Sequence, residues 1–137
     1  MTSISRSRGG ATTVEWAVVA PVIVLFLFGL IVGGLGVFRY QQVASLAREG
    51  ARYASVRGAQ YEQTTRRPAA TPEDVYNNAI LPNMVALDPA RLTYRVTWDP
   101  DNRQNSLVTV QVTYRWIPEA IFGGIDLTST STMAVSY

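Results

Sequence analysis

The chain of 137 residues contains no cysteine and no histidine. These two absences exclude disulfide frameworks, thiolate metal sites and cysteine nucleophiles, and they remove the side chain that most often serves as a general base near neutral pH. Metal binding could use only carboxylates, and the ten acidic residues show no calcium-loop spacing. We therefore expect no enzyme activity, no metal site and no cofactor.

Lysine is also absent, and charged residues make up only 16% of the chain, compared with about a quarter in a typical soluble domain. The net charge of +2 comes from Arg6 and Arg8, because ten arginines balance ten acids from Ala11 to Tyr137. A nucleic-acid-binding protein would be expected to keep a basic face. The neutral body of the chain therefore predicts no nucleic-acid partner.

The shortage of charge is concentrated in one apolar segment, the 23 uncharged residues Trp16–Phe38. At about 1.5 Å per residue, a helix of this length spans roughly 35 Å, enough to cross a lipid bilayer. Pro21 predicts a kink or local melting early in that helix. Gly29, Gly33 and Gly36 include a GxxxG match, which either lets a second helix approach closely or reflects how common glycine is in membrane helices.

Three interpretations of this amino-terminal segment compete. It could be a plain signal anchor, or a cleaved secretory signal with a poor site at Gly34-Leu35-Gly36, although its apolar stretch is long for such a signal. The third interpretation is a leader peptide. Met1–Gly10 is short, polar and basic, and Glu15 stands fifth after Gly10, just before the apolar run.

This opening resembles type IV prepilins, whose basic leader ends in glycine and whose mature chain has glutamate at its fifth position. The resemblance implies cleavage between Gly10 and Ala11, with Trp16 in the place of the aromatic residue of small Flp-type pilins. A lone carboxylate near hydrocarbon costs several kcal/mol. Pairing Glu15 with the new α-amine of a neighbouring subunit would offset that cost and set the axial register of stacked helices. Alternatively, Glu15 sits among lipid headgroups without such a role.

A second motif follows the apolar run, where residues 47–54 read AREGARYA. Together with the opening at residues 10–18 (GATTVEWAV) and Pro21, it resembles TadE-like proteins of the tight-adherence (Tad) pilus system over roughly the first 57 residues. Trp16 replaces the more usual phenylalanine. The resemblance implies these partners: a prepilin peptidase, the major Flp-type pilin and other pseudopilins, the Tad inner-membrane assembly platform, and the lipid bilayer.

Residues 39–61 predict an amphipathic continuation of the helix. Its apolar stripe has members three or four apart: Tyr40, Val43, Leu46, Ala47, Gly50, Tyr53 and Ala54. Residues 60–70 read as a surface loop. In that loop, we expect the adjacent Arg66 and Arg67 to be solvated rather than to form a binding patch.

A second helix is expected to begin with Thr71 as its N-cap and to run to about Leu81. Its first turn holds the adjacent acids Glu73 and Asp74. These two face different directions on a helix, which suits a cap better than a catalytic acid/base pair.

Alternating segments at 91–98, 107–116 and 127–137 predict three antiparallel strands with one apolar face, separated by a turn at 99–105 and a connection that contains Ile121 and Phe122. The residues expected inward are Leu92, Tyr94, Val96 and Trp98, then Val108, Val110, Val112, Tyr114 and Trp116, then Met133, Val135 and Tyr137. The fold class is therefore α+β and pilin-like. A long membrane-spanning helix continues into an amphipathic helix packed on a three- to four-stranded antiparallel sheet.

The expected organisation is a leader at 1–10, a transmembrane and assembly helix at 11–38, and an extracytoplasmic domain at 39–137. The resemblance implies a minor pilin or pseudopilin that acts in assembly, initiation or tip formation of a Tad pilus used for surface adherence. It further implies a single-pass inner-membrane precursor with a cytoplasmic amino terminus. The main alternative is an unprocessed, signal-anchored extracytoplasmic adhesion or binding module. A third and weaker alternative is a hydrolase, which would have to act without histidine or cysteine.

Overall fold

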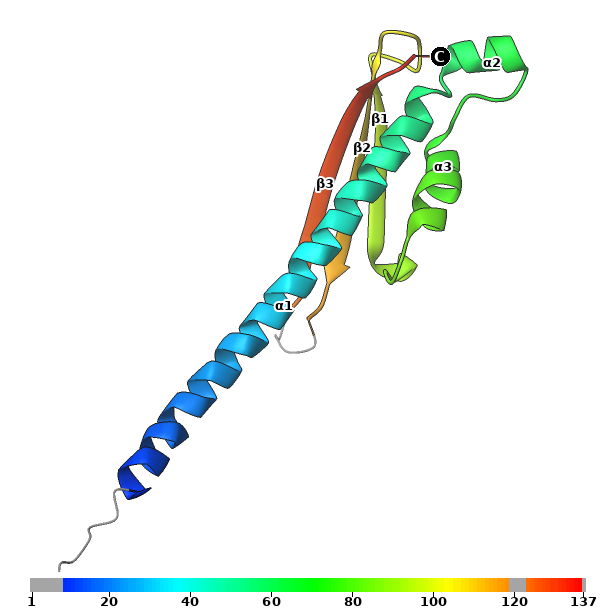
Figure 1. Ribbon diagram of the computed structural model, residues 1–137. Helices are drawn as coiled ribbons and strands as arrows, with labels where there is room; N and C mark the ends of the chain where they lie inside the picture. The colour runs from blue at the N-terminus through cyan, green and yellow to red at the C-terminus, as the bar shows by residue number, and fades with distance from the viewer. Residues whose placement is uncertain (1–8, 119–122, 137) are drawn as a thin grey trace, which may run out of the picture. The chain divides into compact units, whose positions relative to one another are not determined.

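The computed structural model describes residues 9–118 and 123–136, with side chains from Thr12 onward in those ranges. The chain divides into two units, one ending at Gly36 and the other beginning at Val37. Helix α1 (Gly9–Ser55) contributes to both units (Figure 1). Within the described residues, the first unit consists of the apolar part of α1, and the second contains the rest of α1 and all the other elements.

The second unit contains an antiparallel sheet of three strands in the order β1-β2-β3. These are β1 (Leu92–Asp99), the central β2 (Leu107–Trp116) and β3 (Ile125–Ala134). In the middle of the sheet, Val110 lies opposite Val96 on one side and Ser131 on the other. One face of the sheet is buried, as the alternation predicts, and Trp98 and Trp116 pack against this core. The expected inward residue Tyr137, together with Ile121 and Phe122, lies outside the described residues.

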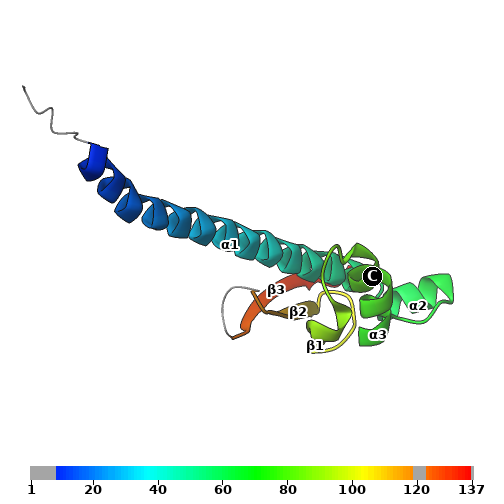
Figure 2. The same ribbon diagram turned by 90° about the horizontal axis from the view of Figure 1, so that it is seen from below.

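The second half of α1 lies along this sheet, with α3 (Pro72–Val75) beside it (Figures 1 and 2). A π-helical turn (Tyr76–Ile80) and a 3₁₀ turn (Leu81–Asn83) extend α3, and another 3₁₀ turn (Pro89–Arg91) leads into β1. The ring of Tyr76 stacks on that of Tyr94 in β1, with centroids 4.7 Å apart. The buried core contains side chains from α1, from α3 and the turn after it, and from β2. They include Val43, Leu46, Ala47, Ala51 and Ala54 of α1, Val75 and Ile80, and Val108, Val110, Val112 and Tyr114 of β2. The predicted α+β fold, a long helix packed on an antiparallel sheet, is confirmed.

The helix predicted at residues 71–81 begins with a capping box. The backbone N–H of Asp74 donates to Thr71 Oγ1 at 3.2 Å, and the backbone N–H of Thr71 donates to Asp74 Oδ2 at 3.0 Å. Each interaction satisfies a backbone donor that a helix start would otherwise leave unpaired. The prediction of Thr71 as N-cap is confirmed.

The prediction that α1 continues to residue 61 is wrong, because α1 ends at Ser55 and α2 (Ala59–Thr65) is a separate helix. In a continuous helix, the N–H of Ala59 would donate to the carbonyl of Ser55. Instead, that carbonyl accepts from the N–H of Ser136 at 2.8 Å, and the Ala59 N–H donates to the carbonyl of Asn102 at 2.7 Å. Part of the expected loop at 60–70 is therefore helical.

The prediction that Tyr40 belongs to the apolar stripe packed in the core is also wrong. Tyr40 is 48% exposed, whereas Val43, one turn later, is fully buried. Among the described residues of α1, Val43 is the first that is fully buried, so Tyr40 lies before the part of the helix that enters the core.

Candidate assembly site on the amino-terminal helix

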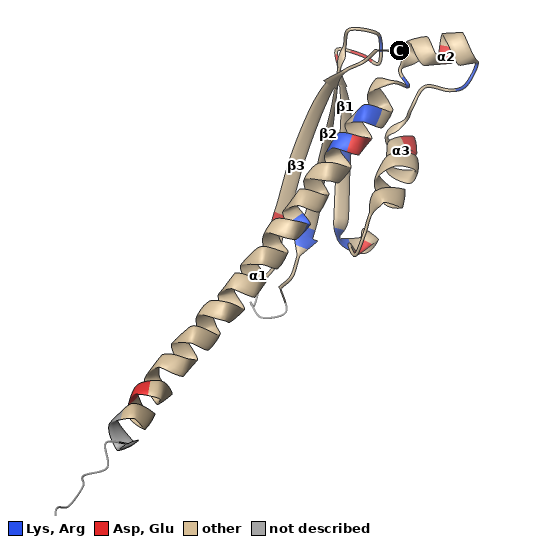
Figure 3. Ribbon diagram, in the orientation of Figure 1, with Lys and Arg blue, Asp and Glu red and all other residues tan. Residues whose placement is uncertain are grey.

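The first unit exposes its apolar side chains. From Val14 to Leu35 the large hydrophobic residues that line its surface are between 44% and 70% exposed. Among the described residues, α1 is the one helix long and apolar enough to cross a membrane, and none of its most apolar window is buried. Figure 3 shows this part of the helix almost entirely without charge. An uncovered apolar surface of this extent requires lipid or other helices around it and indicates a membrane anchor.

Glu15 is the acidic residue of this unit, and it is exposed on α1. Its side chain lines a shallow hollow of about 240 Å³ together with Trp16 and Val19. Glu15 and Trp16 are adjacent in the sequence, and their predicted role in setting the assembly register stays a prediction. Among the described residues, none of the four ion pairs includes Glu15. A carboxylate beside an indole ring and an aliphatic side chain can receive a cationic group that brings apolar surface with it.

The predicted processing residues Gly10 and Ala11 lie in the first turn of α1. Their surroundings fall outside what the structure describes, as do residues 1–8 of the expected leader. Cleavage between Gly10 and Ala11 stays a prediction from the spacing to Glu15.

Two of the three glycines expected to pack against another helix, Gly29 and Gly33, make no close contact within the described chain. A Cβ built on Gly29 or Gly33 would meet nothing within 4 Å. Gly36 is half-buried. Because nothing in the described part of the chain needs Gly29 or Gly33 to lack a side chain, the expected close approach would have to involve a different helix.

The AREGARYA motif has a different role, in the core of the second unit. A Cβ on Gly50 would lie 3.1 Å from Val110 Cγ1 in β2 and 3.3 Å from Val75 Cγ1 in α3. Ala47, Ala51 and Ala54 are likewise fully buried. These small residues let α1 approach the sheet and α3 at once. The charged members of the motif stay at the surface, where Arg52 and Glu49 form an exposed ion pair at 2.9 Å.

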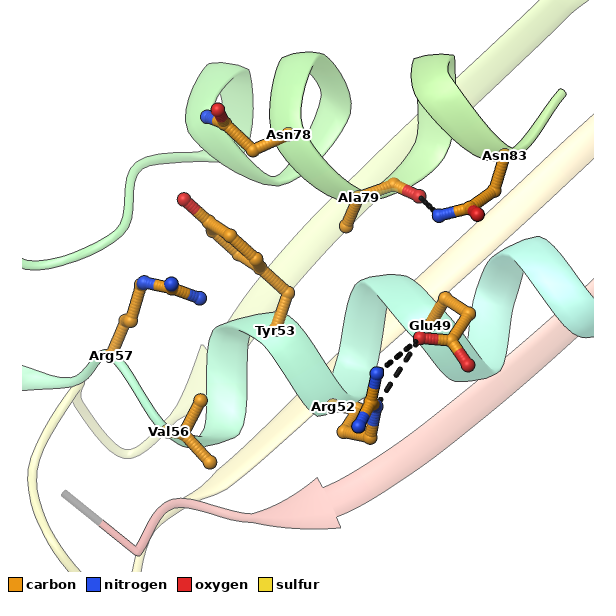
Figure 4. A pocket seen from close by; sticks show the side chains of 8 residues that line it. All are labelled: Glu49, Arg52, Tyr53, Val56, Arg57, Asn78, Ala79 and Asn83. Carbon is orange, nitrogen blue, oxygen red and sulfur yellow. Dashed lines mark hydrogen bonds and ion pairs between the residues drawn. The ribbon is translucent and has the colours of Figure 1, made fainter.

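A further cluster, missed by the sequence reasoning, surrounds Tyr53 at the end of α1. Arg57 stacks its guanidinium on the Tyr53 ring, with the central carbon 3.9 Å from the ring centroid (Figure 4). Both residues line each of two hollows of about 260 Å³. The hollow in Figure 4 is also lined by Asn78 and Asn83, whose amide groups donate to backbone carbonyls. The spacing Tyr53-Arg57-Tyr61 would put all three on one face of the helix predicted to residue 61. Because α1 ends at Ser55 and Tyr61 belongs to α2, the cluster could be found only from the structure.

Comparison with known families supports the amino-terminal assignment. Residues 10–52, about a third of the chain, match the family described as TadE-like protein. The match begins at Gly10, contains Glu15 and the apolar run, and ends within the AREGARYA motif. The resemblance predicted from these motifs is confirmed, and it supports association with a Tad pilus. No curated protein and no solved structure matches the chain.

Proposed function

We propose, from the premise that residues 10–52 form a TadE-like segment, that this protein is a minor pilin of a Tad pilus. In this proposal a prepilin peptidase removes residues 1–10, and α1 then packs among the helices of the major Flp-type pilin and other pseudopilins. The role is structural rather than catalytic. The precursor waits in the inner membrane with its amino terminus in the cytoplasm, and the second unit is exported.

The single observation that supports this proposal most strongly is the lone carboxylate on the exposed apolar part of α1, which is otherwise uncharged as far as Phe38. Glu15 opens onto a hollow shared with Trp16 and Val19 and has no ion-pair partner among the described residues. In an apolar surrounding such a carboxylate is costly. An α-amine created at Ala11 of a neighbouring copy or pilin would supply the missing charge. At about 4 Å and an effective dielectric constant near 20, one such pair contributes about 4 kcal/mol of Coulomb energy.

The proposal makes cleavage and assembly separable by mutation. Gly10→Ala should block cleavage and leave the full precursor in the membrane, because a Cβ would enter the site that the peptidase reads. Glu15→Gln should still be cleaved but should enter pili poorly, because the side chain keeps its size and loses the charge. Glu62→Gln makes the same chemical change at an exposed position on α2 and serves as the matched control.

The test is mass spectrometry of the protein recovered separately from membranes and from sheared pili of the native host. The expected mature chain begins at Ala11 in wild type, Glu15→Gln and Glu62→Gln, while the pilus fraction of Glu15→Gln falls at least tenfold. A chain in the pili that still begins at Met1 would instead favour the unprocessed, signal-anchored adhesion module. Normal incorporation of Glu15→Gln would contradict the charge-pairing argument alone.

A further inference from the structure

A second candidate site lies where the end of α1, helix α2 and the start of α3 meet. It is a pocket of about 260 Å³ whose walls include the rings of Tyr53 and Tyr61, the side chains of Arg57 and Arg67, and the carboxylate of Asp74. This volume falls just below the range of about 300–1,000 Å³ typical of pockets for drug-sized ligands. The pocket therefore has room for a group of about one ring.

Two arginine side chains converge in this pocket. The guanidinium carbon of Arg57 lies 3.9 Å from the centroid of the Tyr53 ring and 5.8 Å from that of Tyr61. The Arg67 side chain beside Tyr61 is the main cause that holds the pKa of Tyr61 below its ordinary 10.0, and Arg57 adds to this effect. A neutral phenol carries only a partial negative charge, so it does not neutralise two guanidinium groups.

Neither arginine has an acidic partner among the described residues. The four ion pairs there use Arg52, Arg91, Arg103 and Arg115. The carboxylate that lines the pocket is already engaged in the cap of α3. Its Oδ2 accepts from the backbone N–H of Thr71 at 3.0 Å and from the Thr71 hydroxyl at 2.7 Å. With two guanidiniums and one carboxylate, the pocket has an excess of one positive charge, which suits a ligand with a single negative charge.

We propose that this pocket binds a carboxylate-bearing sugar. The carboxylate lies between Arg57 and Arg67, whose planar donor groups match the geometry of a carboxylate. The sugar ring packs against the ring of Tyr61, because Arg57 already stacks on Tyr53 and because tyrosine presents an apolar face together with a polar edge. A phosphate would bring close to two negative charges, more than the pocket lacks. The proposal is independent of cleavage and of assembly, because all of its residues lie between Tyr53 and Asp74 in the second unit.

The test is an NMR titration of the full chain in detergent micelles, following the side-chain Nε–Hε signals of arginine. Sodium glucuronate is the probe, with glucose, acetate and inorganic phosphate as comparison ligands. The Arg57 and Arg67 signals are expected to move and saturate with glucuronate. Glucose lacks the carboxylate and acetate lacks the ring, so each should bind at least about tenfold more weakly, and phosphate should be weaker than glucuronate as well.

Variants then locate the binding. Arg67→Gln should weaken glucuronate about tenfold or more, whereas Arg66→Gln, an exposed neighbour that does not line the pocket, should change affinity less than twofold. Arg57 stacks on Tyr53, so Arg57→Gln is interpreted only where the amide signals of β2 are unchanged. The proposal is overturned by any of these results: no saturable shift with glucuronate, equal binding of glucose or phosphate, or unchanged affinity in Arg67→Gln.

Discussion

Replacing Gly50 with alanine sets two opposing effects against each other where α1 contacts both the sheet and α3. Alanine favours a helix by about 1 kcal/mol over glycine. The new Cβ, however, would lie 3.1 Å from Val110 Cγ1, 3.3 Å from Val75 Cγ1 and 3.6 Å from Ile80 Cδ1. All three neighbours are fully buried. They cannot move into open space, and adding a methyl group to such a core costs about 1–3 kcal/mol.

We therefore expect Gly50→Ala to lower the free energy of unfolding by about 1 kcal/mol, the difference between those two effects. For a unit of about 100 residues this corresponds to a fall in Tm of about 4–8 °C. The measurement is thermal unfolding of the full chain in detergent micelles, followed by near-UV circular dichroism of the packed aromatic residues. The matched control is Gly29→Ala, whose Cβ meets nothing within 4 Å and should not lower Tm. A Gly50→Ala protein that melts at or above the wild-type temperature would refute the packing argument.

Two other predictions concern the elements that border the pocket. Ile80→Ala should destabilise the second unit by about 2–5 kcal/mol, because Ile80 is fully buried, whereas the adjacent Leu81→Ala, at 41% exposure, should cost less than about 1 kcal/mol in the same melts. The hydrogen bonds from Thr71 lower the pKa of Asp74 below its ordinary 3.8. The stabilisation from that carboxylate is present above pH 3.8 and is lost as the pH falls through the lowered folded-state pKa. Acid titration of Tm should therefore fall more steeply below pH 4 in wild type than in Asp74→Ala, and parallel curves would contradict the capping role.

The sheet could be predicted because its signal is local. A strand has a period of two, so the alternation in residues 107–116 alone assigns Val108, Val110 and Val112 to the buried face. The same holds for the cap at Thr71, where the acid that completes the capping box is only three residues away. Both predictions depend on neighbours in the sequence and needed no knowledge of the rest of the chain.

The end of α1 could not be predicted in this way. Residues 56–61 contain only one strong helix breaker, Gly58, and α2 begins at the next residue, Ala59. What ends α1 is the capture of the Ser55 carbonyl by Ser136 and of the Ala59 N–H by Asn102. Both partners are more than 40 residues away in the sequence, so local propensity carries no information about them.

The two candidate sites also differ in whether neighbours in the sequence were enough to predict them. Glu15 could be found from its distance to Gly10 and to the apolar run, because the proposed chemistry follows the chain order. The pocket at Tyr53 depends on the reversal of the chain after α2, which places Arg67 and Tyr61 in the wall of the same pocket. The residues before that reversal, Tyr53, Arg57 and Tyr61, show a spacing of four, but the placement of Arg67 required the structure.

The glycines in the two halves of α1 have different neighbours, so substitutions at them can separate an effect on folding from an effect on assembly. Gly50 is needed inside the second unit, whereas Gly33 faces open space in the first. Gly33→Leu should therefore leave the thermal melt of the second unit within about 1 °C of wild type. If Gly33 lies against a neighbouring pilin helix, the same change should lower recovery in sheared pili several-fold, because leucine prevents close helix approach. Ile31→Leu, which changes the side-chain shape at a 61% exposed position without adding volume, is the control for a leucine on this apolar surface. Equal recovery of Gly33→Leu and Ile31→Leu would show that this glycine does not lie in a helix–helix contact.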